Sequence, residues 1–427
     1  MTAPIFVESS AALPLVTITI GFLVGSAADP PGKEGLARVT ARMLRRGAEG
    51  LSDVEIEDRI DRLGGELGVD AGPSAVSLST EVIARNLEPF ADLLASLLLT
   101  PTFPEAEIGR LVREMQAEIV DSRDSDRSLA SRALRRTLFV GHPYGRRVSG
   151  SIASLETITR ADVEGWYRKN VTRQNAVFAF SGDIDAGRAR AIADRILARL
   201  PEGVRAVDST PEPGGVKGRH LVLVDKPDRT QVQLVVGSLG TTPHDADHLA
   251  WSVGNTAFGG TFTSRLMQEV RAKRGWSYGA SSRIGYDRRR DAYAIWSAPG
   301  SADAAACLEL ELGLVADVKR DGLTPEEVDF VKKYLVRSHA FDVDTARKRV
   351  ALPLEEALLG LPPGYHAGWL DRVRAIGHAE VNAALARRMP AADLVVAAVV
   401  TRSETGAALE KALGDVASVT VLEPDFE

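Results

Sequence analysis

The sequence predicts an α+β protein built from two tandem copies of one domain. Its 427 residues are too many for one ordinary hydrophobic core, which favours two domains of roughly 200 residues each. Strand-like and helix-like apolar patterns occur in both halves. The order of these patterns in the first half returns in the second, after a Pro- and Gly-rich stretch at 201–218 that reads as a linker. We therefore expect domains at 1–205 and 206–427.

Local signals place the elements of the first half. From Leu15 the chain alternates as LVTITIGF, which is typical of a strand, and we expect that strand to end near Val24. Ser52 and Glu55 form a capping box, so a helix should begin there and run to Arg62, where two glycines end it. Further helices are expected at 34–46, 87–99, 105–120, 126–139 and 186–200, and further strands at 66–71, 75–84 and 176–181.

The second half repeats this order. The segment LTPEEVDFVKKYL from Leu323 mirrors FPEAEIGRLVREMQAEI from Phe103, and a repeat of about 200 residues is too long for a solenoid, so it indicates a duplicated domain. Strands are expected at 231–237, 279–286 and 292–298, a helix at 246–257, and a charged helix from 263 that ends at Gly275.

Composition excludes several classes of function. A formal charge of −6 and a pI near 5.8 argue against a nucleic-acid-binding surface, and we interpret the basic cluster 288–290 as a solvated turn. Cys307 is the only cysteine, which excludes an internal disulfide or a cysteine-based zinc site and favours a buried, inert thiol.

The N-terminal segment and the overall hydropathy predict the compartment. Residues 1–24 lack a basic leader, and no apolar run approaches the roughly 20 residues of a membrane span. We expect a cytoplasmic protein with no membrane partner, or a periplasmic one if a leader has been removed.

One stretch stands out as a candidate binding site. In TSRLMQEVRAKRGWSYGAS, which begins at Thr263, Leu266, Met267 and Val270 recur at helical spacing, so one face can pack while Arg271 projects from another. Tyr278 follows the glycine stop on a strand-like exit, so a guanidinium and a phenol can converge and hold a carbonyl or an oxyanion. The alternative is a solvated arginine and a tyrosine packed in a sheet.

This stretch resembles the R/Y segment of the insulinase/pitrilysin-type zinc metallopeptidases, and the resemblance extends over nearly the whole chain. In that family an Arg and a Tyr of the second homologous half bind substrate opposite the metal, a role that the resemblance gives to Arg271 and Tyr278. It also implies the family's fold, as in the mitochondrial processing peptidases, with mixed, largely antiparallel sheets covered by helices. Gly259 and Gly260 then match a glycine-rich loop beside the substrate cleft, with an ordinary turn between helices as the alternative.

The family's zinc motif has lost its chemistry in this chain. The family pattern G-x-A-H-x-x-E-H-M corresponds to GLARVTARM from Gly35, so Arg38 and Arg42 replace both histidine ligands and Ala41 replaces the general base. Arginine has no free lone pair with which to bind a metal. Glu118 lies near the family's third ligand, but a lone carboxylate makes no zinc site, and we interpret it as solvated or ion-paired.

Other histidines are weaker candidates. His244 and His248 have the H-x-x-D-H spacing, but they follow Pro243, where a helix is only beginning, so we interpret them as a polar helix entry. His142 opens HPYGRRVSG, which resembles a family loop and is interpreted as structural. We expect no metal in this chain.

The resemblance implies a function for a chain of this kind. It would be the metal-free, substrate-holding subunit of a heterodimeric zinc peptidase, whose homologous partner carries His-x-x-Glu-His and the zinc. Its remaining partner would be a peptide, oriented by Arg271 and Tyr278. The alternatives are a non-catalytic scaffold, like the family's core subunits of respiratory complexes, and a stand-alone peptide-binding homodimer.

Overall fold

The computed structural model describes residues 3–427, which form two compact units. Each half of the chain gives one segment to the unit built mainly from the other half. The division expected at 205/206 lies in the coil at 201–218, and as a boundary between duplicated halves it stays a prediction. Unit 1 contains residues up to Ile119, Arg147–Thr210 and Ala340–His366; unit 2 contains Val120–Arg146, Pro211–His339 and Ala367–Glu427.

Unit 1 is built on a five-stranded sheet with the order β1-β7-β2-β6-β5. Only β1 and β7 pair in parallel, and the other neighbours are antiparallel. The strands are β1 (Ile5–Ser9), β2 (Leu15–Phe22), β5 (Gly65–Ala71), β6 (Val76–Ile83) and β7 (Ala176–Gly182); β3 (Gly47–Ala48) and β4 (Leu51–Ser52) form a separate short hairpin.

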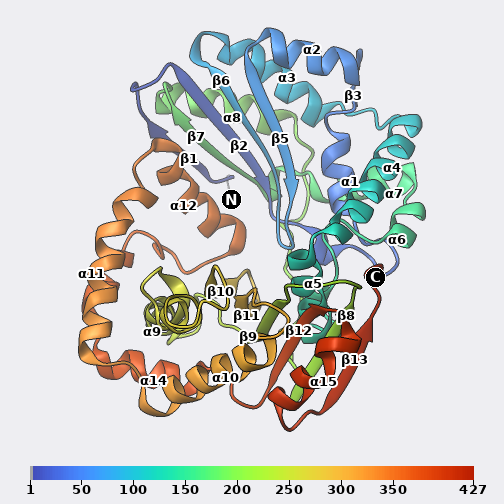
Figure 1. The fold of residues 1–427 in the computed structure, drawn as a ribbon. Helices are drawn as coiled ribbons and strands as arrows, with labels where there is room; N and C mark the ends of the chain where they lie inside the picture. The colour runs from blue at the N-terminus through green and yellow to red at the C-terminus, as the bar shows by residue number, and fades with distance from the viewer. Residues whose placement is uncertain (1–2) are drawn as a thin grey trace. The chain divides into compact units, whose positions relative to one another are not determined.

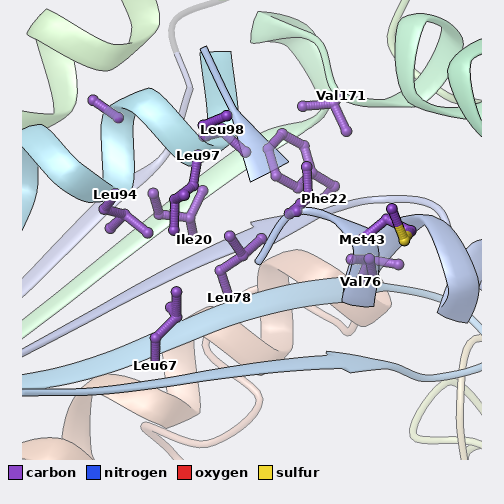
Figure 2. Close-up of a cluster of buried hydrophobic side chains, with 14 of the residues drawn as sticks. Ile20, Phe22, Met43, Leu67, Val76, Leu78, Leu94, Leu97, Leu98 and Val171 are labelled. Carbon is purple, nitrogen blue, oxygen red and sulfur yellow. The ribbon is translucent and has the colours of Figure 1, made fainter. Parts of the chain in front are cut away.

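Helices cover one face of this sheet and enclose the core of unit 1. Figure 2 shows side chains of β2, β5 and β6 pointing toward those of α1 and α3, including Ile20, Leu78 and Leu97. The predicted capping box at Ser52 and Glu55 starts α2. The helices from the first half of the chain are α1 (Leu36–Met43), α2 (Asp53–Arg62), α3 (Leu87–Leu99), α4 (Glu105–Asp121), α6 (Ile152–Glu156), α7 (Arg160–Asn170) and α8 (Ala186–Arg199).

The opposite face is covered by a helix from the second half of the chain. α12 (Ala346–Leu359) lies against β7 and β1 (Figure 1). Successive residues of β7 alternate between the two faces, and Val177 and Ala179 pack with Val350 and Leu354 of α12. This second covering layer explains why every residue from Ala176 to Ser181 is buried.

Unit 2 repeats the same sheet with one extra strand. Its order is β10-β11-β9-β12-β8-β13, so β8, β12, β9, β11 and β10 correspond to β1, β7, β2, β6 and β5 of unit 1. The parallel pair recurs as β8 with β12. The strands are β8 (Arg219–Asp225), β9 (Gln233–Leu239), β10 (Ala280–Tyr286), β11 (Arg290–Ser297), β12 (Leu394–Val400) and β13 (Ser418–Leu422).

A helix from the first half of the chain covers the second face of this sheet. α5 (Asp126–Leu138) packs on β12, β9 and β8, which mirrors the placement of α12 in unit 1. The other helical elements are α9 (His248–Asn255), the π-helical turns η6 (Thr256–Gly260) and η7 (Met267–Ala272), α10 (Ala304–Asp321), α11 (Pro325–Asp342), α13 (Trp369–Ala375), α14 (His378–Arg388) and α15 (Arg402–Leu413).

These elements confirm the predicted tandem α+β fold. Within residues 3–427, no helix combines the length and apolar character needed to cross a membrane. Cys307 is fully buried in the core of unit 2, and burial raises the pKa of its thiol, so it is the inert thiol that was expected. His142 is structural as well, because its Nδ1 accepts from the Tyr144 backbone N and its Nε2 lies 2.9 Å from the Pro211 carbonyl oxygen.

Candidate functional site

The positions that match the zinc motif, Arg38, Ala41 and Arg42, lie on α1 in unit 1. The buried Nε of Arg38 has no hydrogen-bond partner among the described residues. Arg42 donates to Glu118 of α4 over 2.8 Å, so these two residues form an ion pair. Their equivalence to two of the family's metal ligands stays a prediction. Ala41 is buried, and Arg38 lies half-buried one turn before Arg42. The interpretation of Glu118 as an ion-paired residue is confirmed.

An arginine-rich hollow of about 350 Å³ lies beside this ion pair, lined by Arg42, Arg45, Arg46 and Arg110 together with Asp53, Glu57 and Val69. Each arginine is paired: Arg45 with Glu57, Arg46 with Glu107 and Glu114, and Arg110 with Asp53 and Glu114. Arg45 also donates to the Leu67 carbonyl oxygen of strand β5. The acids therefore neutralise the four arginines that line the hollow.

The two histidines at the start of α9 form a hydrogen-bonded helix entry. α9 begins only at His248, so exposed His244 precedes the helix and the two rings do not share a helical turn. His248 Nδ1 lies 2.7 Å from the Thr241 hydroxyl, and burial lowers the pKa of His248 to about 4. Asp247 pairs with Arg388, and hydrogen bonds from Arg388 lower the pKa of that carboxyl. Among residues 3–427, no group of three or more His, Cys, Asp or Glu side chains is placed to hold a metal ion.

The R/Y segment lies in unit 2 and differs from the expected regular helix. Residues Met267–Ala272 form the π-helical turn η7, in which Lys273 N donates to the Gln268 carbonyl oxygen. Leu266 and Val270 are fully buried as expected, whereas Met267 is only half-buried. The wider turn changes which residues share a face, and single π-turns of this kind are frequent at functional sites.

Arg271 and Tyr278 come together at the surface of unit 2. The guanidinium carbon of Arg271 lies 4.4 Å from the centre of the Tyr278 ring and 4.6 Å from the centre of the Phe262 ring. The Tyr278 side chain is 85% exposed, which rules out the alternative of a tyrosine packed in the sheet. The predicted convergence is therefore present, as a stack of the guanidinium on ring faces.

The exit from the helical segment is a turn held by hydrogen bonds, so the expectation that Tyr278 lies on a strand is wrong. β10 begins at Ala280, and Gly275 ends the helical segment with φ of +67°. Between them, the buried Ser277 hydroxyl bonds the Gly279 carbonyl oxygen and accepts from Ala298 N at 3.0 Å. These bonds fix the turn from beneath and leave Tyr278 pointing outward.

Gly259 and Gly260 form the end of η6, and Thr261 separates them from Phe262. A Cβ on Gly259 would lie 2.7 Å from the Ser282 backbone N of β10 and 2.6 Å from Leu266, so only glycine permits this close approach. Asn255 reinforces it by donating to the Ser282 carbonyl oxygen over 3.2 Å. Gly259 thus supports the loop that carries Phe262, whereas Gly260 is exposed at its edge. A role in a substrate cleft stays a prediction.

Arg271 differs from the other basic residues of its segment in its partners. Arg265 pairs with Glu327, and Lys273 and Arg274 both pair with Glu269. Within residues 3–427, by contrast, the guanidinium of Arg271 makes no ion pair or hydrogen bond, and neither does the Tyr278 hydroxyl. Five guanidinium N–H groups and one phenol are therefore free to bind a carbonyl or carboxylate oxygen.

Sequence reasoning missed Phe262 and Ser277, which had no signal apart from their proximity to the segment.

Comparisons with known proteins agree with this architecture. Residues 5–151 match the family model for insulinase (peptidase family M16), and residues 157–335 match the model for the peptidase M16 inactive domain. A Mycobacterium tuberculosis protein named as an uncharacterized zinc protease is 28% identical over 72% of this chain and 71% of its own. The non-peptidase homolog YmxG of Helicobacter pylori is 22% identical over 89% of this chain and 87% of its own.

Solved structures share the fold over nearly the full length. A peptidase M16 inactive domain from Pseudomonas fluorescens has a TM-score of 0.86 and 26% identity, covering 93% of this chain and 95% of that one. A chain of Complex III2 from Candida albicans, with a TM-score of 0.74, 12% identity and coverage of 96% and 97%, shares the fold alone. The two matched models, the repeated sheet and the altered zinc motif lead to one conclusion: the chain belongs to the insulinase family of peptidases (M16), as a member whose zinc-motif positions hold Arg38, Ala41 and Arg42.

Proposed function

We propose that this chain is the metal-free, substrate-binding subunit of a heterodimeric zinc metallopeptidase. The observation that carries the proposal is the contrast around Arg271: its neighbours are ion-paired, whereas its guanidinium is stacked on exposed rings with every N–H free. A charged donor left without an acceptor at the surface is suited to an acceptor supplied by a ligand.

The residues support a division of labour between two chains. Arg38, Ala41 and Arg42 can neither ligate zinc nor take a proton from a metal-bound water, so the metal and the base would come from a homologous partner that carries His-x-x-Glu-His. Arg271 and Tyr278 would then donate to the carbonyl oxygen of the peptide as negative charge develops on it. This chain alone should hold no stoichiometric zinc and should cleave no peptide.

The test is co-expression with the homologous chain that bears His-x-x-Glu-His, followed by assays of peptide cleavage, assembly and zinc content. Arg271→Ala and Tyr278→Phe should each lower kcat/KM about 10²- to 10³-fold, the typical loss for one oxyanion-binding donor. Arg274→Ala is the matched control, because that arginine lies on the same segment but is paired with Glu269. It should cleave as the unaltered complex does.

Assembly separates this function from the scaffold alternative. Both Arg271→Ala and Tyr278→Phe should leave complex formation and the partner's zinc content unchanged, since both side chains lie at the surface and support no core packing. If Tyr278→Phe left kcat and kcat/KM within about twofold in an intact complex, the pair would be structural and the scaffold function would be preferred.

A further inference from the structure

Phe262 is an exposed phenylalanine whose ring contacts the guanidinium of Arg271. Its side chain is 66% exposed at the start of the segment that leads into η7. The guanidinium carbon of Arg271 lies 4.6 Å from its ring centre. Phe262 and Tyr278 make no ring contact with each other among the described residues, so each ring meets the guanidinium separately.

The backbone holds these two rings in place from opposite ends of the segment. On the Phe262 side, Ser264 N donates to the Thr261 carbonyl oxygen and closes a tight turn around Phe262, directly after the packed Gly259. On the Tyr278 side, the bonds of Ser277 fix the second turn. Both rings therefore come from constrained turns, although both side chains are exposed to solvent.

Ring faces constrain an arginine in a different way from an acid. A carboxylate binds the N–H edge of the guanidinium and occupies its donors, as Glu327 does to Arg265. A ring binds the face of the planar group and leaves the edge open. An unconstrained arginine side chain would have to lose much of its rotamer freedom when a ligand binds.

We propose that Phe262 is a positioning residue, which holds the guanidinium of Arg271 against a second aromatic face so that its N–H edge is presented to the substrate carbonyl. This inference rests on the proposed function for the use of that edge, while the positioning itself is a property of the isolated chain. The ligand class is a planar oxygen acceptor, namely the carbonyl group of a peptide.

The isolated chain provides the first readout. In NMR spectra of the arginine Nε–H groups, the signal of Arg271 should show the ring-current shift of a stacked guanidinium and low mobility. Phe262→Ala should remove most of that shift and increase the mobility, and Phe262→Trp should preserve both effects because it keeps an aromatic face. Phe330→Ala, which removes an exposed phenyl group of α11, is the control and should leave the Arg271 signal unchanged.

Cleavage by the complex provides the second readout. Phe262→Ala should lower kcat/KM about 2- to 5-fold, which corresponds to the loss of one exposed cation–π contact, and Phe262→Trp should restore it. An unchanged Arg271 signal in Phe262→Ala overturns the positioning role, whatever the complex does. The positioning role is also overturned if Phe262→Ala changes the Arg271 signal but leaves cleavage unchanged while Arg271→Ala impairs cleavage. If neither Arg271→Ala nor Phe262→Ala alters cleavage, the proposed function fails, and the positioning role falls with it.

Discussion

Two arginine-containing regions, one in each unit, are held in opposite ways: by acids around Arg42 and by ring faces at Arg271. Around the zinc-motif positions of unit 1, Glu118 binds Arg42, and other acids bind Arg45, Arg46 and Arg110. Arg38 makes no ion pair among the described residues, and its buried Nε has no hydrogen-bond partner there. In the R/Y segment of unit 2, Arg271 is supported by the faces of Phe262 and Tyr278 and keeps its donors free. The acids already occupy the arginines around Arg42, whereas Arg271 still has donors to offer a ligand.

This difference indicates which of the two regions still has groups that are free to bind a ligand. An exposed ion pair contributes little to stability, typically below about 1 kcal/mol, and the side-chain exposures of 24% for Arg42 and 47% for Glu118 place their pair in that class. The Arg42–Glu118 pair is therefore only a weak brace of unit 1. In the R/Y segment, the charge is retained and its partners are apolar surfaces.

The strongest test of this comparison restores metal ligands in unit 1. A combined Arg38→His, Ala41→Glu, Arg42→His variant would place two imidazoles one turn apart on α1 and release Glu118, whose carboxylate already reaches the side chain at position 42. Zinc should rise from none to about one per chain, with a binding free energy of order 10 kcal/mol. Elemental analysis and calorimetry measure both quantities.

The control adds Glu118→Gln to the same variant, which removes the charged third ligand and should weaken zinc binding sharply. A folded triple variant that binds no zinc would show that α1 and α4 no longer hold the geometry of a metal site. Stoichiometric zinc in the unaltered chain, lost on changing His244 and His248, would instead reassign the metal to α9.

A second contrast concerns buried carboxyl groups. Asp29 in unit 1 accepts from the backbone N of Gly35 and of Ala37, both over 3.0 Å, and so caps α1. Glu311 in unit 2 is fully buried, has a thiol 3.8 Å from one oxygen, and has no hydrogen-bond partner for the other among the described residues. Burial raises the pKa of Glu311 from 4.5 to about 7.

Unit 2 should therefore lose stability as the pH rises. Between about pH 4.5 and pH 7 the folded chain keeps a proton on Glu311 that the unfolded chain has released, so the free energy of unfolding should fall by roughly 3 kcal/mol over that range and level off above it. Glu311→Gln should remove this part of the pH dependence. Urea unfolding at several pH values measures it, with Asp29→Asn as the comparison that should keep the Glu311 slope.

The assignment would be contradicted if the free energy of unfolding rose from pH 5 to pH 7 in the unaltered chain, and rose by the same amount in Glu311→Gln. In that case the carboxylate must be stabilised in its charged form by a group that faces it. Cys307, whose thiol contacts Glu311, and Tyr293, which interacts with Glu311 electrostatically, would both be neutral in this range because burial raises their pKa values.

Much of the fold could be predicted because its signals are local. The alternation in β2 and the capping box of α2 lie within a few residues of chain, and both elements formed where they were expected. The exchange of α5 and α12 could not be predicted, because the apolar face of a helix does not reveal which sheet it covers. β1 and β8 were also missed as first strands of their halves.

The candidate site, like the fold, has some parts that the sequence could predict and some that it could not. Arg271, Tyr278 and the altered zinc positions were visible as residue types at fixed spacing. The support of Arg271 by Phe262 was not, because it depends on two turns that bring residues nine positions apart face to face. The outward direction of Tyr278 depends on hydrogen bonds of Ser277 to Gly279 and to Ala298, which spacing along the chain does not reveal.

The smallest expected effects come from a detail that the two units share. A glycine in the central strand of each sheet faces the exchanged helix: a Cβ on Gly21 of β2 would lie 2.6 Å from Leu358 of α12, and one on Gly237 of β9 would lie 2.5 Å from Leu134 of α5. Contacts this short force a neighbour to move. The two sites differ in which neighbours can do so.

Gly237→Ala should cost more than Gly21→Ala. At Gly237 the added methyl also meets the Tyr293 backbone oxygen at 2.9 Å, and Leu134 is buried, so overpacking should cost about 1–3 kcal/mol. At Gly21 the methyl meets only the end of the half-buried Leu358, which can turn aside, so the cost should stay below about 1 kcal/mol. Urea unfolding measures the loss of unfolding free energy for each glycine variant. The double variant Leu134→Ala, Gly237→Ala should lose less unfolding free energy than the sum of the two single variants. Equal costs at both glycines, or strict additivity with Leu134→Ala, would mean that α5 does not press on β9 at this point.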